Sequence, residues 1–192
     1  MKFKHKLSLW AVGAFVALAV FSSDANALTP QPLDIKVRVN VTKDLSVSAT
    51  YYHFGTLSAA VSSNSATAIA VTNASGGLVQ TYTIQGADAA SEGVGTTWTL
   101  AGSPSTDTYT LQGQFASTRP DNVDGTWASD AMTTSAVACS DTQFGNGVIE
   151  ESGSSVSPLA VAKDRNLWFR IKTPTVVSDL TSHKATITLA VE

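Results

Sequence analysis

Few residues of this chain have the types and spacing that catalysis requires. A nucleophile–base–acid triad needs a histidine to relay the proton, and beyond the first 27 residues only His53 and His183 remain. Neither lies in a catalytic motif, no Gly-x-Ser-x-Gly elbow occurs, and the single cysteine, Cys139, carries no family signature. Two histidines and one cysteine far apart also lack the spacing of zinc ligands. The sequence therefore predicts a protein that is not an enzyme and needs no cofactor.

The carboxylates closest to a metal-site pattern stand in the segment 121–125, Asp-Asn-Val-Asp-Gly. Calcium prefers several oxygen ligands that converge from a short loop, so Asp121 and Asp124 are weak calcium candidates, with Glu150 and Glu151 as ligands from a neighbouring loop. In an EF-hand register Pro120 would stand at the first ligand position, and no glutamate stands at the twelfth. The pattern favours ordinary turn chemistry over calcium binding.

Aromatic side chains offer a second chemistry, the stacking of flat rings on the faces of sugars. Trp98 and Trp127 are the candidates for such ligand stacking. Trp168 and Phe169 are neighbours, and successive residues of a strand point to opposite faces, so one of them is expected in the core.

Strands must position all of these residues, because apolar side chains recur with a period of two along the chain. The clearest strands are residues 33–41 and 181–192. Residues 167–173 form another strand and are expected to make a closing hairpin with 181–192. The inward sides of the two clearest strands are Leu33, Ile35, Val37, Val39 and Val41, and Ala185, Ile187, Leu189 and Val191.

Shorter alternating stretches fill most of the remaining chain. Residues 45–51 form a second alternating stretch after a turn near residues 42–44, residues 66–85 read as a hairpin, and residues 109–115 alternate again. No long stretch has a capped 3.6-residue period, and residues 119–148 form a long irregular excursion. About eight strands separated by turns predict an all-β, antiparallel, immunoglobulin-like Greek-key β-sandwich in a single domain, residues 28–192. A closed barrel is the alternative.

The first 27 residues predict export. Three lysines among the first six residues precede the apolar run Leu7–Phe21, and Ala25-Asn26-Ala27 resembles a signal-peptidase site, so residues 1–27 read as a cleavable signal peptide. A run of about 15 apolar residues is short of the roughly 20 that cross a bilayer. We therefore expect no membrane span after cleavage.

The net charge and the single cysteine limit the kinds of partner that the chain is expected to have. Cleavage leaves nine basic and fourteen acidic residues, a net charge of −5, which argues against nucleic acid as a partner. One cysteine allows no disulfide within the chain. Cys139 is more readily explained as a small buried apolar residue than as a bridge between two copies.

Several short motifs give the chain a resemblance to known families. It resembles bacterial secreted β-sandwich surface proteins, namely WxL-type cell-surface domains and the spore-coat-U and pilin-like subunits, in most of residues 33–192. The resemblance implies a non-catalytic surface or assembly role. The motifs that carry it are Phe54-Gly-Thr-Leu57, Ala70-Val-Thr-Asn73, Trp98-Thr-Leu100, Leu167-Trp-Phe-Arg170 and Ala185-Thr-Ile-Thr-Leu189.

Together these features predict a secreted structural subunit that associates with copies of itself at the cell surface. Its regular terminal strands suit addition to a neighbour's sheet, and residues 28–41 are a candidate for an exchanged strand, paired either within one subunit or between two. The alternative is a secreted module that binds a glycan or another surface partner.

Overall fold

The computed structural model describes residues 33–41, 45–74, 82–140, 142–145 and 164–191. The expected signal peptide, the arm 28–32, Glu150 and Glu151 lie outside these residues. The described chain is all-β, as predicted. Its only helical element is the four-residue 3-10 turn η1 (Asp124–Trp127), and no helix there is long and apolar enough to span a membrane.

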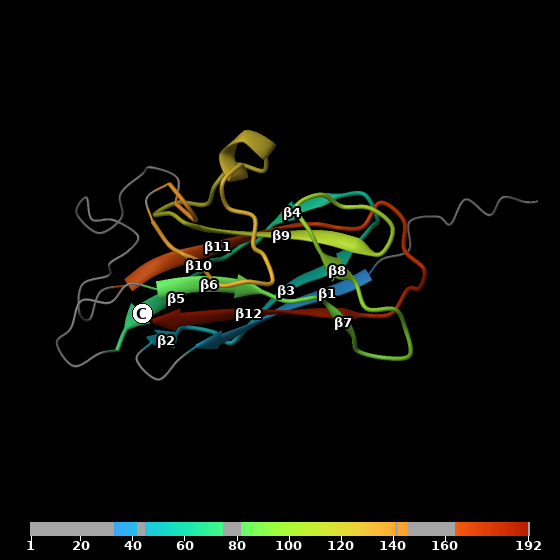
Figure 1. Cartoon of the computed structure of the whole chain (residues 1–192), viewed down its shortest axis with the longest axis horizontal. Helices are drawn as coiled ribbons and strands as arrows, with labels where there is room; N and C mark the ends of the chain where they lie inside the picture. The colour runs from blue at the N-terminus through green and yellow to red at the C-terminus, as the bar shows by residue number, and fades with distance from the viewer. Residues whose placement is uncertain (1–32, 42–44, 75–81, 141, 146–163, 192) are drawn as a thin grey trace, which may run out of the picture.

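Two six-stranded sheets make up the fold (Figure 1). Sheet A has the order β10-β6-β12-β1-β3, with β7 also pairing with β12. Its strands are β1 (Leu33–Val41), β3 (Tyr51–Leu57), β6 (Tyr82–Gly86), β7 (Ala90–Ser91), β10 (Val137–Ala138) and β12 (His183–Val191).

Sheet B has the order β2-β5-β11-β9-β8, with β4 also pairing with β11. Its strands are β2 (Leu45–Val47), β4 (Ser62–Asn64), β5 (Ile69–Asn73), β8 (Thr99–Leu100), β9 (Thr108–Phe115) and β11 (Asp164–Lys172). One hydrophobic cluster contains buried residues from both sheets, which gives the chain a sandwich-like core.

The pairing corrects three sequence-based expectations. The sheets are mixed, because β1 runs parallel to β12 and β8 runs parallel to β9. The expected closing hairpin is wrong, since β11 belongs to sheet B and β12 to sheet A. The expected 66–85 hairpin is wrong for the same reason, with β5 in sheet B and β6 in sheet A. Alternation shows which side of a strand is buried, but it does not identify the neighbouring strand.

The chain also changes sheet where a single strand was expected after the first turn. Residues 45–51 divide into β2, in sheet B, and the start of β3, in sheet A, with Ser48 to Thr50 between them. The alternation pattern puts Leu45 and Tyr51 on the same face of one strand, but the chain passes from one sheet to the other between them. As a result Leu45 is buried while Tyr51 is 44 % exposed.

Part of the irregular excursion packs on sheet B. Residues 130–132 run along β9, where the Gly113 amide donates to the Asp130 carbonyl and the Met132 amide to the Leu111 carbonyl. Met132 is buried, and a Cβ added at Gly113 would lie 2.4 Å from its Cε. Glycine at position 113 therefore leaves space for the Met132 side chain, which packs residues 130–132 against the core.

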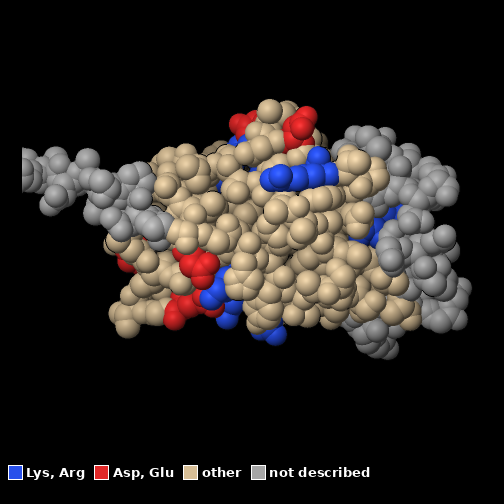
Figure 2. Space-filling view, turned by 180° about the vertical axis from the view of Figure 1, so that it is seen from behind, with Lys and Arg blue, Asp and Glu red and all other residues tan. Residues whose placement is uncertain are grey.

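Charged side chains are sparse on the surface. On the face shown in Figure 2 they gather in a few small groups separated by wide uncharged areas, in keeping with a chain in which 14 % of residues are charged. This face therefore offers large uncharged areas and a few localised ionic positions.

Candidate assembly surface

β1 is the strand that brings the predicted assembly residues together. It pairs in parallel with β12 from Ile35 to Val41 and antiparallel with β3 on its other side. The pairing of residues 33–41 in this structure is thus within one chain. Exposure is 0–2 % for Leu33, Ile35, Val37, Val39, Ile187 and Leu189, whereas Val41 and Val191 are only partly buried against the core.

The opposite face of β1 is charged. The Lys36 ammonium contacts the carboxylates of Glu92 at 2.6 Å and Asp34 at 3.5 Å. The hydrogen bond to Glu92 is the main reason why the pKa of Lys36 is raised. Arg38, two residues further along the same face, is exposed and has no ion-pair partner among the described residues. The positive charge of Arg38, beside β3, is therefore not neutralised by a carboxylate of the described residues.

β3 is an edge strand of sheet A and is interrupted by a bulge. Ile35 pairs with Gly55 and Lys36 with His53, which leaves Phe54 as the extra residue. Gly55 has a φ of 70°, a conformation that favours glycine. Bulges disturb the row of free backbone groups at a sheet edge and so discourage unspecific strand addition. The edge of β3 is consequently less suited to uncontrolled pairing than its length suggests.

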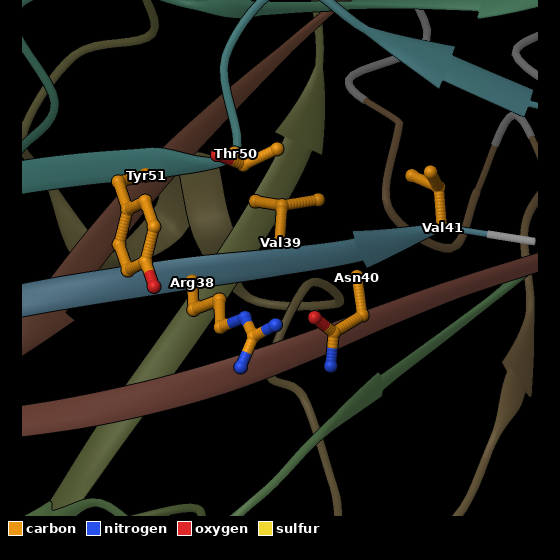
Figure 3. Close-up of a pocket in the computed structure, with 6 residues that line it drawn as sticks. All are labelled: Arg38, Val39, Asn40, Val41, Thr50 and Tyr51. Atoms are coloured by element: carbon orange, nitrogen blue, oxygen red, sulfur yellow. The ribbon is translucent and has the colours of Figure 1, made fainter.

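A groove lies where β1 extends beyond the start of β3 (Figure 3). Its volume is about 390 Å³, and the last β1–β3 pair is Arg38 with Tyr51. Arg38 and Asn40 extend from one side of β1, and Val39 and Val41 extend from the other, with the Tyr51 ring beside Arg38. The groove thus places an exposed aromatic ring next to a guanidinium that has no ion-pair partner among the described residues.

A buried polar layer lies on the other side of the molecule, between sheet B and the excursion. Arg170 is 2 % exposed. Its Nε donates to Asn122 Oδ1 at 2.8 Å, its Nη1 to Gln112 Oε1 at 3.2 Å and its Nη2 to Asp124 Oδ1 at 2.7 Å. Gln112 Nε2 in turn donates to the Trp127 carbonyl at 2.7 Å. Arg170 and Gln112, two strand side chains bonded to each other, thereby hold the two ends of η1 in place.

Asp130 is the buried acid of this layer. It is 1 % exposed and accepts a hydrogen bond from Gln114 Nε2 at 2.8 Å. Burial raises its pKa to about 7, although the hydrogen bonds from Gln114 and the Phe144 backbone oppose the shift. Asp130 Oδ1 and Gln114 Oε1 have no hydrogen-bond partner in the structure. A proton on Asp130 is therefore well accommodated there.

The calcium candidates have other roles in this arrangement. The Asp124 carboxylate contacts the Lys172 ammonium and the Arg170 guanidinium, each at 2.7 Å, and the hydrogen bond from Lys172 is the main cause of its lowered pKa. Asp121 accepts the Trp127 Nε1 hydrogen bond through its backbone carbonyl at 2.8 Å. The described residues contain no group of three metal-ligating side chains. Asp124 neutralises side-chain cations instead.

Both ligand-stacking candidates are internal. Trp98 and Trp127 are 0 % exposed, so neither ring presents a face to solvent. Trp98 stacks on the imidazole of His183, with ring centroids 3.9 Å apart. His183 is itself buried, and its two ring nitrogens each lie 2.8 Å from a backbone carbonyl oxygen, those of Thr181 and Thr96. The two tryptophans fill the interior.

The remaining candidate catalytic residues are not brought together. His53 lies on the outer face of β3, while His183 lies in the interior at the start of β12, with β1 between the two strands. Cys139 follows β10 and is 7 % exposed, as expected for a small buried apolar residue.

Neither the groove nor the polar layer was predicted from the sequence. Gln112 and Gln114 alternate with apolar residues and suggested a solvent-facing side of β9, yet both are buried. The signal was the excursion itself, because its tryptophan and methionine need a surface to pack against. Arg38 and Tyr51 are far apart in the sequence pattern, and only the β1–β3 register places them side by side.

Comparison with known proteins does not place the chain in a family. No protein-family model matches the sequence, and no curated protein matches it.

Proposed function

We propose that the protein is an exported structural subunit that assembles with its own copies into an extracellular filament, coat or surface layer, with the N-terminal strand exchanged between copies. The observation that carries this proposal is the place of β1, the first described strand, in the middle of sheet A between β12 and β3. Cleavage after residue 27, as proposed from the sequence, would place the new N-terminus close before this strand.

When β1 is exchanged, it makes with the neighbouring copy the same contacts that it makes with β12 and β3 of its own chain in this structure. Its four fully buried side chains, Leu33, Ile35, Val37 and Val39, are each worth roughly 1.5–3 kcal/mol of apolar burial. A subunit without its own β1 therefore exposes a long apolar slot between β12 and β3. Exchange of an identical element costs little in interactions, because the same contacts reform between two copies.

We also propose that the two sheets form an immunoglobulin-like sandwich with Greek-key connections. Consecutive strands such as β5 and β6, or β11 and β12, lie in different sheets. Connections that cross from one sheet to the other support an immunoglobulin-like Greek-key sandwich. The resemblance to secreted surface and pilin-like subunits implies the same architecture. The low share of charged residues, 14 % of the chain, is in keeping with a structural subunit.

Electron microscopy of the exported protein tests the proposal. The mature chain, residues 28–192, is expected to form regular polymers under negative stain. Deletion of residues 28–41 is expected to abolish the polymers and to leave an unstable subunit with an open slot. A deletion variant that is well folded and still polymerises would contradict strand exchange.

A peptide experiment separates failure to assemble from failure to fold. A synthetic peptide of residues 33–41 is added during refolding of the deletion variant and should restore a cooperative unfolding transition. The matched control peptide carries Val37→Asp, which places a carboxylate at a 0 % exposed position and should not restore it. Equal rescue by both peptides would show that the slot does not recognise the strand.

A further inference from the structure

The excursion presents a rigid projection on the sheet B side of the molecule. All five residues 121–125, called here the η1 knob, are exposed, and Val123 is 55 % exposed between two aspartates. Figure 1 shows η1 standing away from both sheets at the top of the view. Asp121 has no side-chain ion pair among the described residues.

The knob is held in one conformation. The Trp127 indole donates to the Asp121 carbonyl, and Arg170 donates to the side chains of Asn122 and Asp124. Arg170 and Trp127 are both buried, so these contacts fix the projection to the core of the sandwich. A preordered projection loses little conformational entropy when it docks.

The groove at the end of β1 has the complementary chemistry. It carries the exposed ring of Tyr51 beside Arg38, which has no ion-pair partner among the described residues, whereas Val39 and Val41 extend from the other side of β1 toward the core (Figure 3). No carboxylate is among the six lining residues. The Asp121 carboxylate of the knob therefore complements the Arg38 guanidinium of the groove in charge.

We propose that the η1 knob of one copy docks into the β1–β3 groove of the next copy. This inference rests on the proposed self-assembly and supplies it with a second contact. The knob belongs to the sheet B side and the groove to sheet A. A contact between two different surfaces is heterologous, and its repetition gives a filament or layer that stays open at both ends.

Charge reversal in the full-length exported protein tests the contact. Arg38→Glu and Asp121→Arg are each expected to raise the critical concentration for polymer formation about tenfold, equivalent to about 1.4 kcal/mol. The doubly reversed chain, with both substitutions, should return to within about threefold of the wild type, because the ion pair reforms with opposite polarity. Lys184→Glu is the control, since Lys184 lies on β12 and outside the groove. It should leave the critical concentration unchanged.

Each other outcome has a distinct meaning. Wild-type polymers that are insensitive to both reversals overturn the knob–groove contact and leave the proposed function standing. Wild-type protein that stays monomeric overturns the proposed function, and the contact with it. An effect of Arg38→Glu that Asp121→Arg neither shares nor rescues would assign the groove to a different anionic partner, such as an acidic glycan, and would overturn docking of a second copy.

Discussion

Asp130→Asn should stabilise the protein at alkaline pH and have little effect in acid. The pKa of Asp130 is raised from 3.8 to about 7 by burial. The folded protein therefore holds a proton that the unfolded chain releases, and this contribution is complete below about pH 4 and is lost as the pH rises to about 7. Each pKa unit corresponds to 1.36 kcal/mol, so ionisation costs the folded state up to about 4 kcal/mol at pH 8.

Asparagine is the appropriate probe because it has nearly the same shape and carries no charge. Its amide oxygen can keep the hydrogen bond from Gln114 Nε2, and its amide nitrogen can donate to the unpartnered Gln114 Oε1. We expect Asp130→Asn to raise the free energy of unfolding by about 1–4 kcal/mol at pH 8 and by less than about 0.5 kcal/mol at pH 4.

Urea unfolding followed by tryptophan fluorescence, at constant ionic strength from pH 4 to pH 8, measures this difference. The control is Asp121→Asn, an exposed position whose difference from the wild type should not grow between pH 4 and pH 8. If Asp130→Asn destabilises the protein at pH 8, the charged form of Asp130 is the favoured one, and the reasoning about its burial is wrong.

The remaining predictions concern the core, the tryptophans and the metal candidates. Ile35→Ala should cost about 2–5 kcal/mol in urea unfolding because Ile35 is 1 % exposed, whereas Lys184→Ala, on the outer side of sheet A, should stay within about 0.5 kcal/mol of the wild type. Trp127→Ala should lower stability by about 3–5 kcal/mol, because the ring is fully buried; tryptophan fluorescence that iodide quenches as efficiently as that of free indole would contradict the burial of Trp98 and Trp127. Calcium at millimolar concentration should leave Tm unchanged relative to EDTA, since Asp124 already pairs with two side-chain cations, and a rise of several degrees would restore the calcium candidate.

The sequence allowed the buried faces of the strands to be predicted, because alternation is a local property. Leu33 to Val39 and Ala185 to Leu189 place their apolar residues in the core as expected. Strand partners were not predictable in this way. The β1–β12 pair joins residues almost a whole domain apart, and two expected hairpins are divided between the sheets. Pairing depends on the packing of the whole chain.

The candidate site was predictable to a similar extent. β1 was correctly predicted as a regular strand whose apolar residues face the core. Trp98 and Trp127 stood out by residue type, but residue type does not reveal exposure, and both rings are buried. Arg38 and Tyr51 drew no attention because an arginine and a tyrosine at strand ends are common. Their proximity follows from the antiparallel β1–β3 register.

The central claim, that β1 of one copy occupies the slot of another, has a direct test by disulfide trapping. Asn40 and Thr188 are paired across β1 and β12, with side chains on the outer face, and neighbouring strands bring Cα atoms within disulfide range. With Cys139 replaced by alanine, two differently tagged chains, one Asn40→Cys and one Thr188→Cys, are co-assembled and oxidised. Strand exchange predicts a disulfide that joins the two tags in the polymer. Polymers without that cross-link, formed by chains whose double variant closes the same disulfide internally, would show that each β1 stays in its own subunit.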